Sequence, residues 1–255
     1  MYGNRIQRGI LGLILLSGLS ACSGGGGDTS TASPTALSVN PAEGLWLGTI
    51  PTTNRAMSGL VLDDGSYWIL YSVSGNPSIL AGLIQGTSSS QNGTFTSSDA
   101  KDFNLQTGLL NATITGSYVT KQGFTGTISY SQGNGPNTFT TTYDSDYDLP
   151  PDMNAVAGTY TGFITTSETA TVEVTATGGI SGSSNTGCVF TGTFAPRTHG
   201  NVFNVTITFG GQSGCSLGAE TVNGIGFYDA GAKQLTSAAF NSGKTDGFVF
   251  IGTKS

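Results

Sequence analysis

The chain has 255 residues, a formal net charge of −6 and only 9% charged residues. With so few Lys and Arg, it lacks the basic surface that binding to nucleic acid or to anionic lipid headgroups requires, and we expect neither partner for the folded body. Its 40 glycines, together with plentiful Ser and Thr, are typical of exported β-proteins.

The first 21 residues have the organisation of a secretory signal peptide. Arg5 and Arg8 supply positive charge, residues 10–16 form a short apolar core, and small residues precede Cys22. The apolar run is shorter than the roughly 20 residues that a transmembrane helix needs. We therefore expect residues 1–21 to be removed, which leaves 234 of the 255 residues and changes the net charge from −6 to −8, because both arginines are lost.

The four residues Leu19-Ser20-Ala21-Cys22 resemble the lipobox of bacterial lipoproteins. The resemblance implies a diacylglycerol on the sulfur of Cys22, cleavage before Cys22 and usually a third acyl chain on the new amino group. Two or three acyl chains anchor a protein firmly, since each buried methylene contributes about 0.8 kcal/mol. In this family an Asp directly after the lipidated cysteine usually retains the protein at the inner membrane. Ser23 stands at that position here, so the resemblance implies sorting to the outer membrane of a Gram-negative cell. The alternative is an ordinary signal peptide followed by an incidental cysteine.

Residues 22–42 are predicted to be a flexible tether. Four glycines at 24–27 and the polar stretch 28–34 cannot bury enough apolar surface to fold. Such a tether gives a lipid anchor slack between the bilayer and the folded body.

From residue 43 onward the sequence is β in character. Apolar and polar residues alternate with a period of two, as in half-buried strands, most clearly over 124–130, 170–176 and 203–209. No window has a helical period. The length after cleavage exceeds that of a usual single domain and suits two domains of about 100 residues each.

An internal repeat supports two domains. Residues 44–48 (Gly-Leu-Trp-Leu-Gly) match residues 158–162 (Gly-Thr-Tyr-Thr-Gly), 114 positions later. A turn follows each copy after about 15 residues, and a Phe-Thr-Gly-Thr unit occurs at 124–127 and at 190–193. Each half holds about eight strand candidates, and eight strands can close into a barrel that is filled by side chains or holds one small ligand.

The predicted fold is therefore all-β, with two consecutive small antiparallel meander barrels behind the lipidated tether. The first barrel is expected over 43–148 and the second over 157–255. The linker is expected over 149–156, because Pro150-Pro151 is stiff and cannot continue a ladder of strand hydrogen bonds.

The motif Gly44-Leu45-Trp46 at the start of an eight-strand unit resembles that of calycins, the lipocalin and avidin barrels, and Gly158-Thr159-Tyr160 is a degenerate second copy. The lipidated, glycine-rich double-barrel organisation also resembles surface lipoproteins of the transferrin-binding-protein-B kind. These resemblances imply a barrel fold and a binding role. No motif carries over a binding residue from either family.

Cys188 and Cys215 are the cysteines that remain after Cys22. In an exported chain two cysteines most simply form one disulfide, whose loop of roughly 27 residues would contribute about 3 kcal/mol. There is no Cys-x-x-Cys and only one histidine, which argues against zinc, and we expect no cofactor.

Two further sets of polar residues are candidates for chemistry. Asp144, Asp146 and Asp148 alternate as in a calcium-binding loop, but Leu149 stands where an EF-hand needs Gly, so we interpret them as a solvated acidic linker. The single histidine, His199, lies in a predicted hairpin tip without a partner base or nucleophile, so we interpret it as a turn residue.

The stretch Tyr67-Trp68-Ile69-Leu70-Tyr71 is apolar on both faces, whereas a strand with one wet face should alternate. Either its outer face packs on the second domain, which we favour, or Tyr67, Trp68 and Tyr71 form an exposed binding surface.

These observations predict a non-enzymatic, lipid-anchored binding module of the outer membrane. One alternative is a carrier of a small apolar ligand inside a barrel, which a large apolar cavity would favour. Another is an envelope enzyme with an unrecognised carboxylate site, which clustered carboxylates in a cleft would favour. Filled barrels together with an exposed aromatic strand would favour a protein partner.

Overall fold

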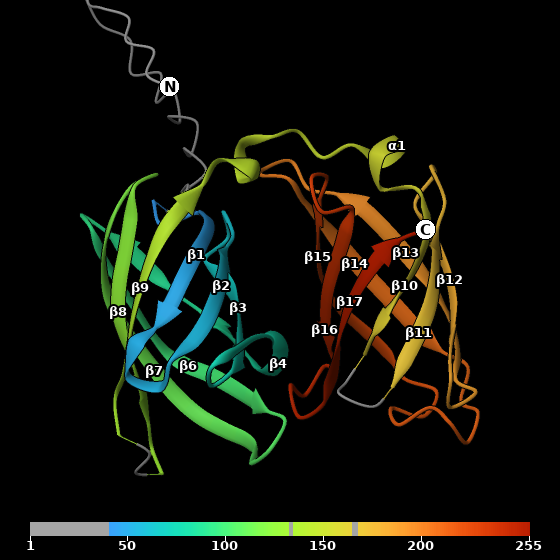
Figure 1. The fold of residues 1–255 in the computed structure, drawn as a ribbon, viewed down its shortest axis with the longest axis horizontal. Coiled ribbons are helices and arrows are strands. Elements are labelled where there is room, and N and C mark those ends of the chain that lie inside the picture. Colours follow the sequence, from blue (N-terminus) through green and yellow to red (C-terminus); the bar gives the residue numbers. More distant parts are fainter. Residues whose placement is uncertain (1–40, 133–134, 165–167) are drawn as a thin grey trace, which may run out of the picture. The chain divides into compact units, whose positions relative to one another are not determined.

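The computed structural model describes residues 41–132, 135–164 and 168–255 (Figure 1). The predicted signal peptide, the lipidated Cys22 and all but the last two residues of the tether lie outside these residues. Within them, no helix reaches the length and hydrophobicity that crossing a membrane requires.

The first barrel is antiparallel throughout. Eight strands form its ring in the order β4-β3-β2-β1-β9-β8-β7-β6, and pairing between β4 and β6 closes it, while the three-residue β5 adds to β6. The strands are β1 (Gly44–Ile50), β2 (Arg55–Val61), β3 (Ser66–Val73), β4 (Asn76–Thr87), β5 (Ser89–Gln91), β6 (Thr94–Asn104), β7 (Gly108–Val119), β8 (Gly123–Tyr130) and β9 (Asn137–Asp144). A 3₁₀ turn, η1 (Pro51–Thr53), joins β1 to β2.

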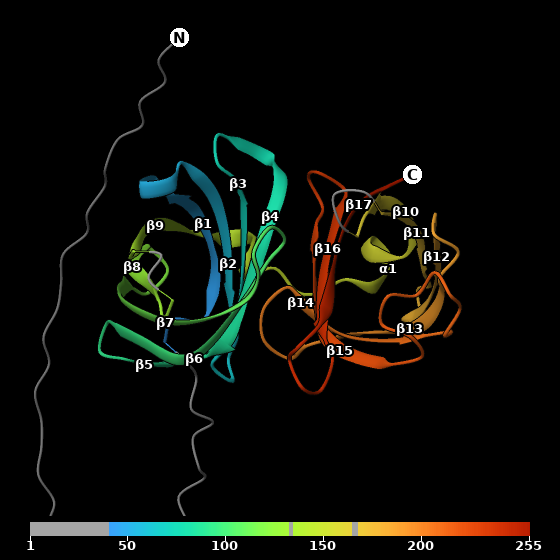
Figure 2. The same ribbon diagram turned by 90° about the horizontal axis from the view of Figure 1, so that it is seen from below.

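The second barrel is an eight-stranded meander in which each strand pairs with the next and β17 closes on β10. Its strands are β10 (Gly158–Phe163), β11 (Thr169–Val174), β12 (Gly179–Ser184), β13 (Val189–Pro196), β14 (Val202–Phe209), β15 (Thr221–Asp229), β16 (Gln234–Phe240) and β17 (Gly247–Lys254). Figure 2 shows each set of strands curling round on itself. The predicted fold class, two antiparallel eight-strand barrels, is confirmed.

Between β9 and β10 the chain forms two short helical turns, η2 (Ser145–Asp148) and α1 (Met153–Val156). Asp152 begins α1, and its Oδ1 accepts hydrogen bonds from the backbone N–H of Asn154 (2.8 Å) and Ala155 (3.3 Å). This is an N-cap, which satisfies donors that a helix start leaves unpaired. Periodicity could not predict a helix of four residues.

Both barrels are filled by the inward-facing half of their strands. In β14, Phe203, Val205 and Ile207 are buried whereas Asn204 and Thr208 are exposed, as the period of two predicts. Full burial of such an apolar side chain contributes about 1.5–3 kcal/mol. The spaces left inside the first and second barrels measure about 10 Å³ and 50 Å³.

The predicted repeat has a structural basis at the first strand of each barrel. The Trp46 indole donates a 2.9 Å hydrogen bond to the carbonyl of Ala42, and the Tyr160 hydroxyl donates to the carbonyl of Val156, in each case four residues earlier. Gly48 and Gly162, two residues after these aromatics, are also equivalent, because an added Cβ at either would lie 2.0 Å from a carbonyl oxygen of the neighbouring strand.

The predicted equivalence of the two Phe-Thr-Gly-Thr units is wrong. Residues 124–127 lie in β8, the seventh strand of the first ring in chain order, and residues 190–193 lie in β13, the fourth strand of the second. The two copies are therefore not equivalent positions. They share only a residue composition that is common in the strands of small barrels.

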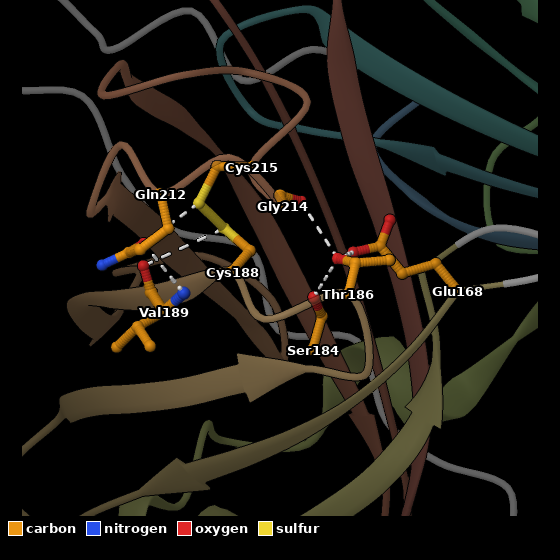
Figure 3. Close-up of a disulfide and its surroundings, with 8 residues drawn as sticks. All are labelled: Glu168, Ser184, Thr186, Cys188, Val189, Gln212, Gly214 and Cys215. Carbon is orange, nitrogen blue, oxygen red and sulfur yellow. Dashed lines mark hydrogen bonds between the residues drawn. A yellow bond between two sulfur atoms is a disulfide. The ribbon is translucent and has the colours of Figure 1, made fainter.

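The predicted disulfide between Cys188 and Cys215 is confirmed (Figure 3). It ties the start of β13 to the loop between β14 and β15, with the two Cα atoms 4.6 Å apart. Beside it the Thr186 hydroxyl lies 2.7 Å from Ser184 Oγ, 2.9 Å from Glu168 Oε1 and 3.0 Å from the Gly214 carbonyl. These contacts join the loops at this end of the second barrel.

Candidate binding cleft

The outer face of β1–β4 is apolar and packs against the second barrel. Leu45, Leu60 and Trp68 are in register across β1, β2 and β3. A matching row crosses β15, β16 and β17 of the second barrel: Ile225, Ala238 and Val249. All six are buried in one apolar cluster that both barrels share, so the hydrophobic effect that fills each barrel also joins their outer faces.

Trp68 is the largest side chain of this shared cluster. Its ring stacks on Phe240 of the second barrel, with centroids 5.2 Å apart and planes 6° apart, and Phe103 also stacks on Phe240 at 4.1 Å. Only 8% of Trp68 is exposed, and its Nε1 has no hydrogen-bond partner among the described residues. This packing explains why β3 is apolar on both faces.

Tyr67 and Tyr71 point into the first barrel. They are 0% and 5% exposed, and their hydroxyls lie 2.8 Å from Ser97 Oγ and 2.6 Å from Asp102 Oδ1. The alternative in which Tyr67, Trp68 and Tyr71 form an exposed binding surface is therefore wrong. Alternation turns both tyrosines inward, and the second barrel covers the tryptophan.

Beside the contact between the barrels, their outer faces leave an open cleft of about 350 Å³. Leu60, Trp68 and Ile225 line its buried part, and Leu47 and Ile79, which are 39% and 43% exposed, line its rim. The volume is near the lower end of the roughly 300–1,000 Å³ typical of ligand sites. The cleft is far larger than the space inside either barrel.

The charged side chains that line the cleft are all acidic. Asp144, Asp146 and Asp229 contribute carboxylates, each half-buried, and none of them takes part in an ion pair among the described residues. No described Lys or Arg lines the cleft. It therefore combines an apolar wall with unneutralised negative charge.

The aspartates considered for calcium do not converge. Asp144 Oδ1 accepts the backbone N–H of Asp146 at 2.9 Å and so begins η2, whereas Asp148 Oδ1 accepts from Lys121 Nζ (2.7 Å) and Tyr143 OH (2.8 Å). The hydrogen bond from Lys121 lowers the pKa of Asp148. Across residues 41–132, 135–164 and 168–255, no three His, Cys, Asp or Glu side chains are placed to hold a metal ion.

The hairpin between β13 and β14 reaches the first barrel. Arg197 Nη2 donates a 2.6 Å hydrogen bond to Asp63 Oδ1 and lies 3.3 Å from Asp64 Oδ2, in the turn between β2 and β3. Burial alone would lower the pKa of Arg197, but the two carboxylates outweigh burial and raise it. His199, in the same hairpin, is 38% exposed, and its Nδ1 lies 3.7 Å from Glu43 Oε1.

Sequence reasoning missed the carboxylate of Asp102, which is 1% exposed on the inward face of β6. It lies beside Tyr71 and Tyr130, at an open pocket separate from the cleft. The available signal was a charged residue at a strand position that alternation with Ala100 assigns to the core.

Comparisons with known proteins give little beyond this geometry. No family model matches the chain, and no curated protein matches it. Among solved structures, isotype 1 transferrin binding protein B from serogroup B Neisseria meningitidis is similar over 79% of this chain, with 10% sequence identity and a TM-score of 0.26. The chain covers 66% of that protein's length. A likeness of this degree carries no inference about what this chain binds.

Proposed function

We propose that the protein is a non-catalytic binding module, anchored to the outer membrane by lipid on Cys22, that engages a protein partner through the cleft between its barrels. The observation that carries this proposal is the cleft itself, which is open, about 350 Å³ in volume, apolar inside and acidic. The lipid anchor rests on the residues of the lipobox alone.

The chemistry of the cleft defines the partner segment. Leu47 and Ile79 offer exposed apolar contact, and burying apolar surface contributes about 25 cal/mol per Å². Asp144, Asp146 and Asp229 favour a cationic flank and disfavour an acidic one. We therefore expect a peptide segment with a large apolar residue next to Lys or Arg.

The carrier alternative is less well supported. The spaces inside the barrels, about 10 Å³ and 50 Å³, are small beside the roughly 150 Å³ cavity that accommodates a benzene ring. An apolar ligand in either of these two spaces would have to displace core side chains. For an enzyme, the cleft offers carboxylates, but no described nucleophile–base pair accompanies them.

The test is selection of displayed random peptides on the immobilised protein. We expect enriched peptides to pair an apolar residue with Lys or Arg. Their affinity should fall about tenfold in Ile79→Ser, the effect of losing one apolar anchor. The matched control is Val119→Ser, which removes an apolar side chain of 57% exposure that does not line the cleft. Equal loss in both variants, or none in either, would contradict the proposal.

A charge variant tests the acidic residues separately. Asp146→Asn should slow association and reduce its dependence on salt, since charges near an interface act mainly on the association rate. Glu173→Gln, an exposed change on β11 away from the cleft, should leave both unchanged. Equal salt dependence in Asp146→Asn and the unmodified protein would remove the electrostatic part of the proposal.

A further inference from the structure

The interior of the first barrel contains a carboxylate where its fold calls for an apolar residue. Asp102 is the only Asp, Glu, Lys or Arg among the buried residues of the described chain. Its inward neighbour two positions earlier, Ala100, is an ordinary core residue. When a sequence otherwise matches its fold, a residue that breaks the pattern of apolar core positions is a candidate for a functional site.

Hydrogen bonds hold this carboxylate in place. The Tyr71 hydroxyl donates to Oδ1 at 2.6 Å, and the Tyr130 hydroxyl donates to Oδ2 at 2.8 Å. Asn104 Nδ2 donates to the Tyr71 hydroxyl at 3.0 Å, while its Oδ1 accepts from the backbone of the turn that follows β6. The groups come from three strands, β3, β6 and β8, so their positions are fixed by the barrel.

Burying the Asp102 carboxylate is energetically unfavourable if its role is only structural. Burial raises the pKa of Asp102 above its ordinary value, although both tyrosine hydroxyls and nearby Arg55 act in the opposite direction. Replacing buried charged groups with well-packed apolar residues is often neutral or stabilising. The other buried residues of the first barrel that the structure describes are uncharged, most of them apolar, so stability does not explain the carboxylate.

The cluster lies at a pocket of about 210 Å³. Most of its lining residues have polar side chains, with amides, hydroxyls and the guanidinium of Arg55 among them. That guanidinium lies over the Tyr71 ring, 5.4 Å from its centroid, and Nη1 donates a 2.7 Å hydrogen bond to the Ser72 carbonyl. The remaining polar lining consists of Thr53, Asn104, Gln106, Thr107, Tyr130 and Asn137.

The composition of this lining selects among ligand classes. Apolar molecules would displace water from these polar side chains without replacing its hydrogen bonds, which disfavours their binding. The carboxylate and the guanidinium offset each other's charge, so neither a simple anion nor a simple cation is favoured. What fits is a neutral molecule with several donors and acceptors.

We infer that this pocket binds a small neutral polyhydroxyl molecule of monosaccharide size, with Asp102 and Tyr130 among the groups that hydrogen-bond it. This site does not depend on the proposed function of the cleft, because the two are lined by different residues apart from Tyr71.

The test is ligand-observed NMR on the purified full-length protein, in a detergent without a sugar headgroup. The probes are glucose, galactose, mannose and N-acetylglucosamine, with acetate and ethylamine as charged controls. We expect saturable binding of at least one sugar and none of the charged controls. No saturation by any sugar up to about 100 mM, or preferential binding of either ion, would overturn the inference.

Three variants connect binding to the pocket. Tyr130→Phe removes one hydroxyl and should weaken sugar binding about fivefold, the effect of a single hydrogen bond. Asp102→Asn should weaken it more. Tyr67→Phe is the matched control, since it removes a buried tyrosine hydroxyl of the same barrel that does not line the pocket. Equal sugar affinity in Tyr130→Phe and Tyr67→Phe, with both variants folded by circular dichroism, would place any binding elsewhere.

Discussion

Replacing Trp68 and Phe240 by alanine, singly and together, measures the contact between the barrels. Truncating a buried aromatic residue costs about 3–5 kcal/mol of unfolding free energy. For Trp68 this is reduced, because its buried Nε1 has no partner in the part of the chain that the structure describes, and leaving such a donor unsatisfied costs about 1–3 kcal/mol. We therefore expect about 2–3 kcal/mol for Trp68→Ala and about 3–5 kcal/mol for Phe240→Ala.

The double variant isolates the stacking. Stacked aromatic pairs contribute about 0.5–1.5 kcal/mol beyond their buried area, so the two losses should be non-additive by that amount. Guanidinium unfolding, followed by circular dichroism and by fluorescence, gives the three free energies. The sequence has two tryptophans, so Trp46 remains as a reporter in the core of the first barrel. Additivity within about 0.3 kcal/mol would refute a direct contact between these rings.

Three further predictions concern other parts of the chain. Cys22→Ala should leave the precursor uncleaved and free of acyl label from supplied fatty acid; processing without lipid in both variant and unmodified protein would contradict the lipobox. Breaking the bond between Cys188 and Cys215 should lower the unfolding free energy by roughly 2–5 kcal/mol in thermal melts, without effect on the first barrel; free thiols in non-reducing mass mapping would contradict the bond. Burial raises the pKa of Asp102 above its ordinary value of 3.8, so between these two pKa values the folded state binds more protons than the unfolded state, and this group's contribution to stability falls as pH rises. Asp102→Asn should remove this contribution to the pH dependence of the unfolding free energy, measured between acid and neutral pH, and an unchanged pH dependence would contradict it.

The fold was predictable because its signals are local. Alternation identifies strands such as β14, and matching motifs at Trp46 and Tyr160 mark the first strand of each barrel. A disulfide also followed from counting the cysteines of an exported chain. Each of these inferences needs only neighbouring residues or composition.

The candidate sites were not predictable in the same way, because they depend on long-range pairing. Trp68 faces the second barrel only because β3 joins β2 and β4 in register and presents that face to β15–β17. Asp102 meets Tyr71 and Tyr130 across three strands, 31 and 28 residues apart in sequence. The sequence shows that β3 is apolar on its outer face and that Asp102 is a charged residue at a core position. It does not show which elements surround these residues.

The cleft as the site of partner binding is tested most directly in living cells. A photo-crosslinking benzoylphenylalanine is incorporated in place of Ile79 and, as control, in place of Val119; both are exposed apolar positions of the first barrel, and only the first lines the cleft. We expect a specific adduct from position 79 alone, joined to a segment that mass spectrometry shows to contain an apolar residue beside Lys or Arg. Adducts from position 119 alone, or the same adducts from both positions, would contradict it.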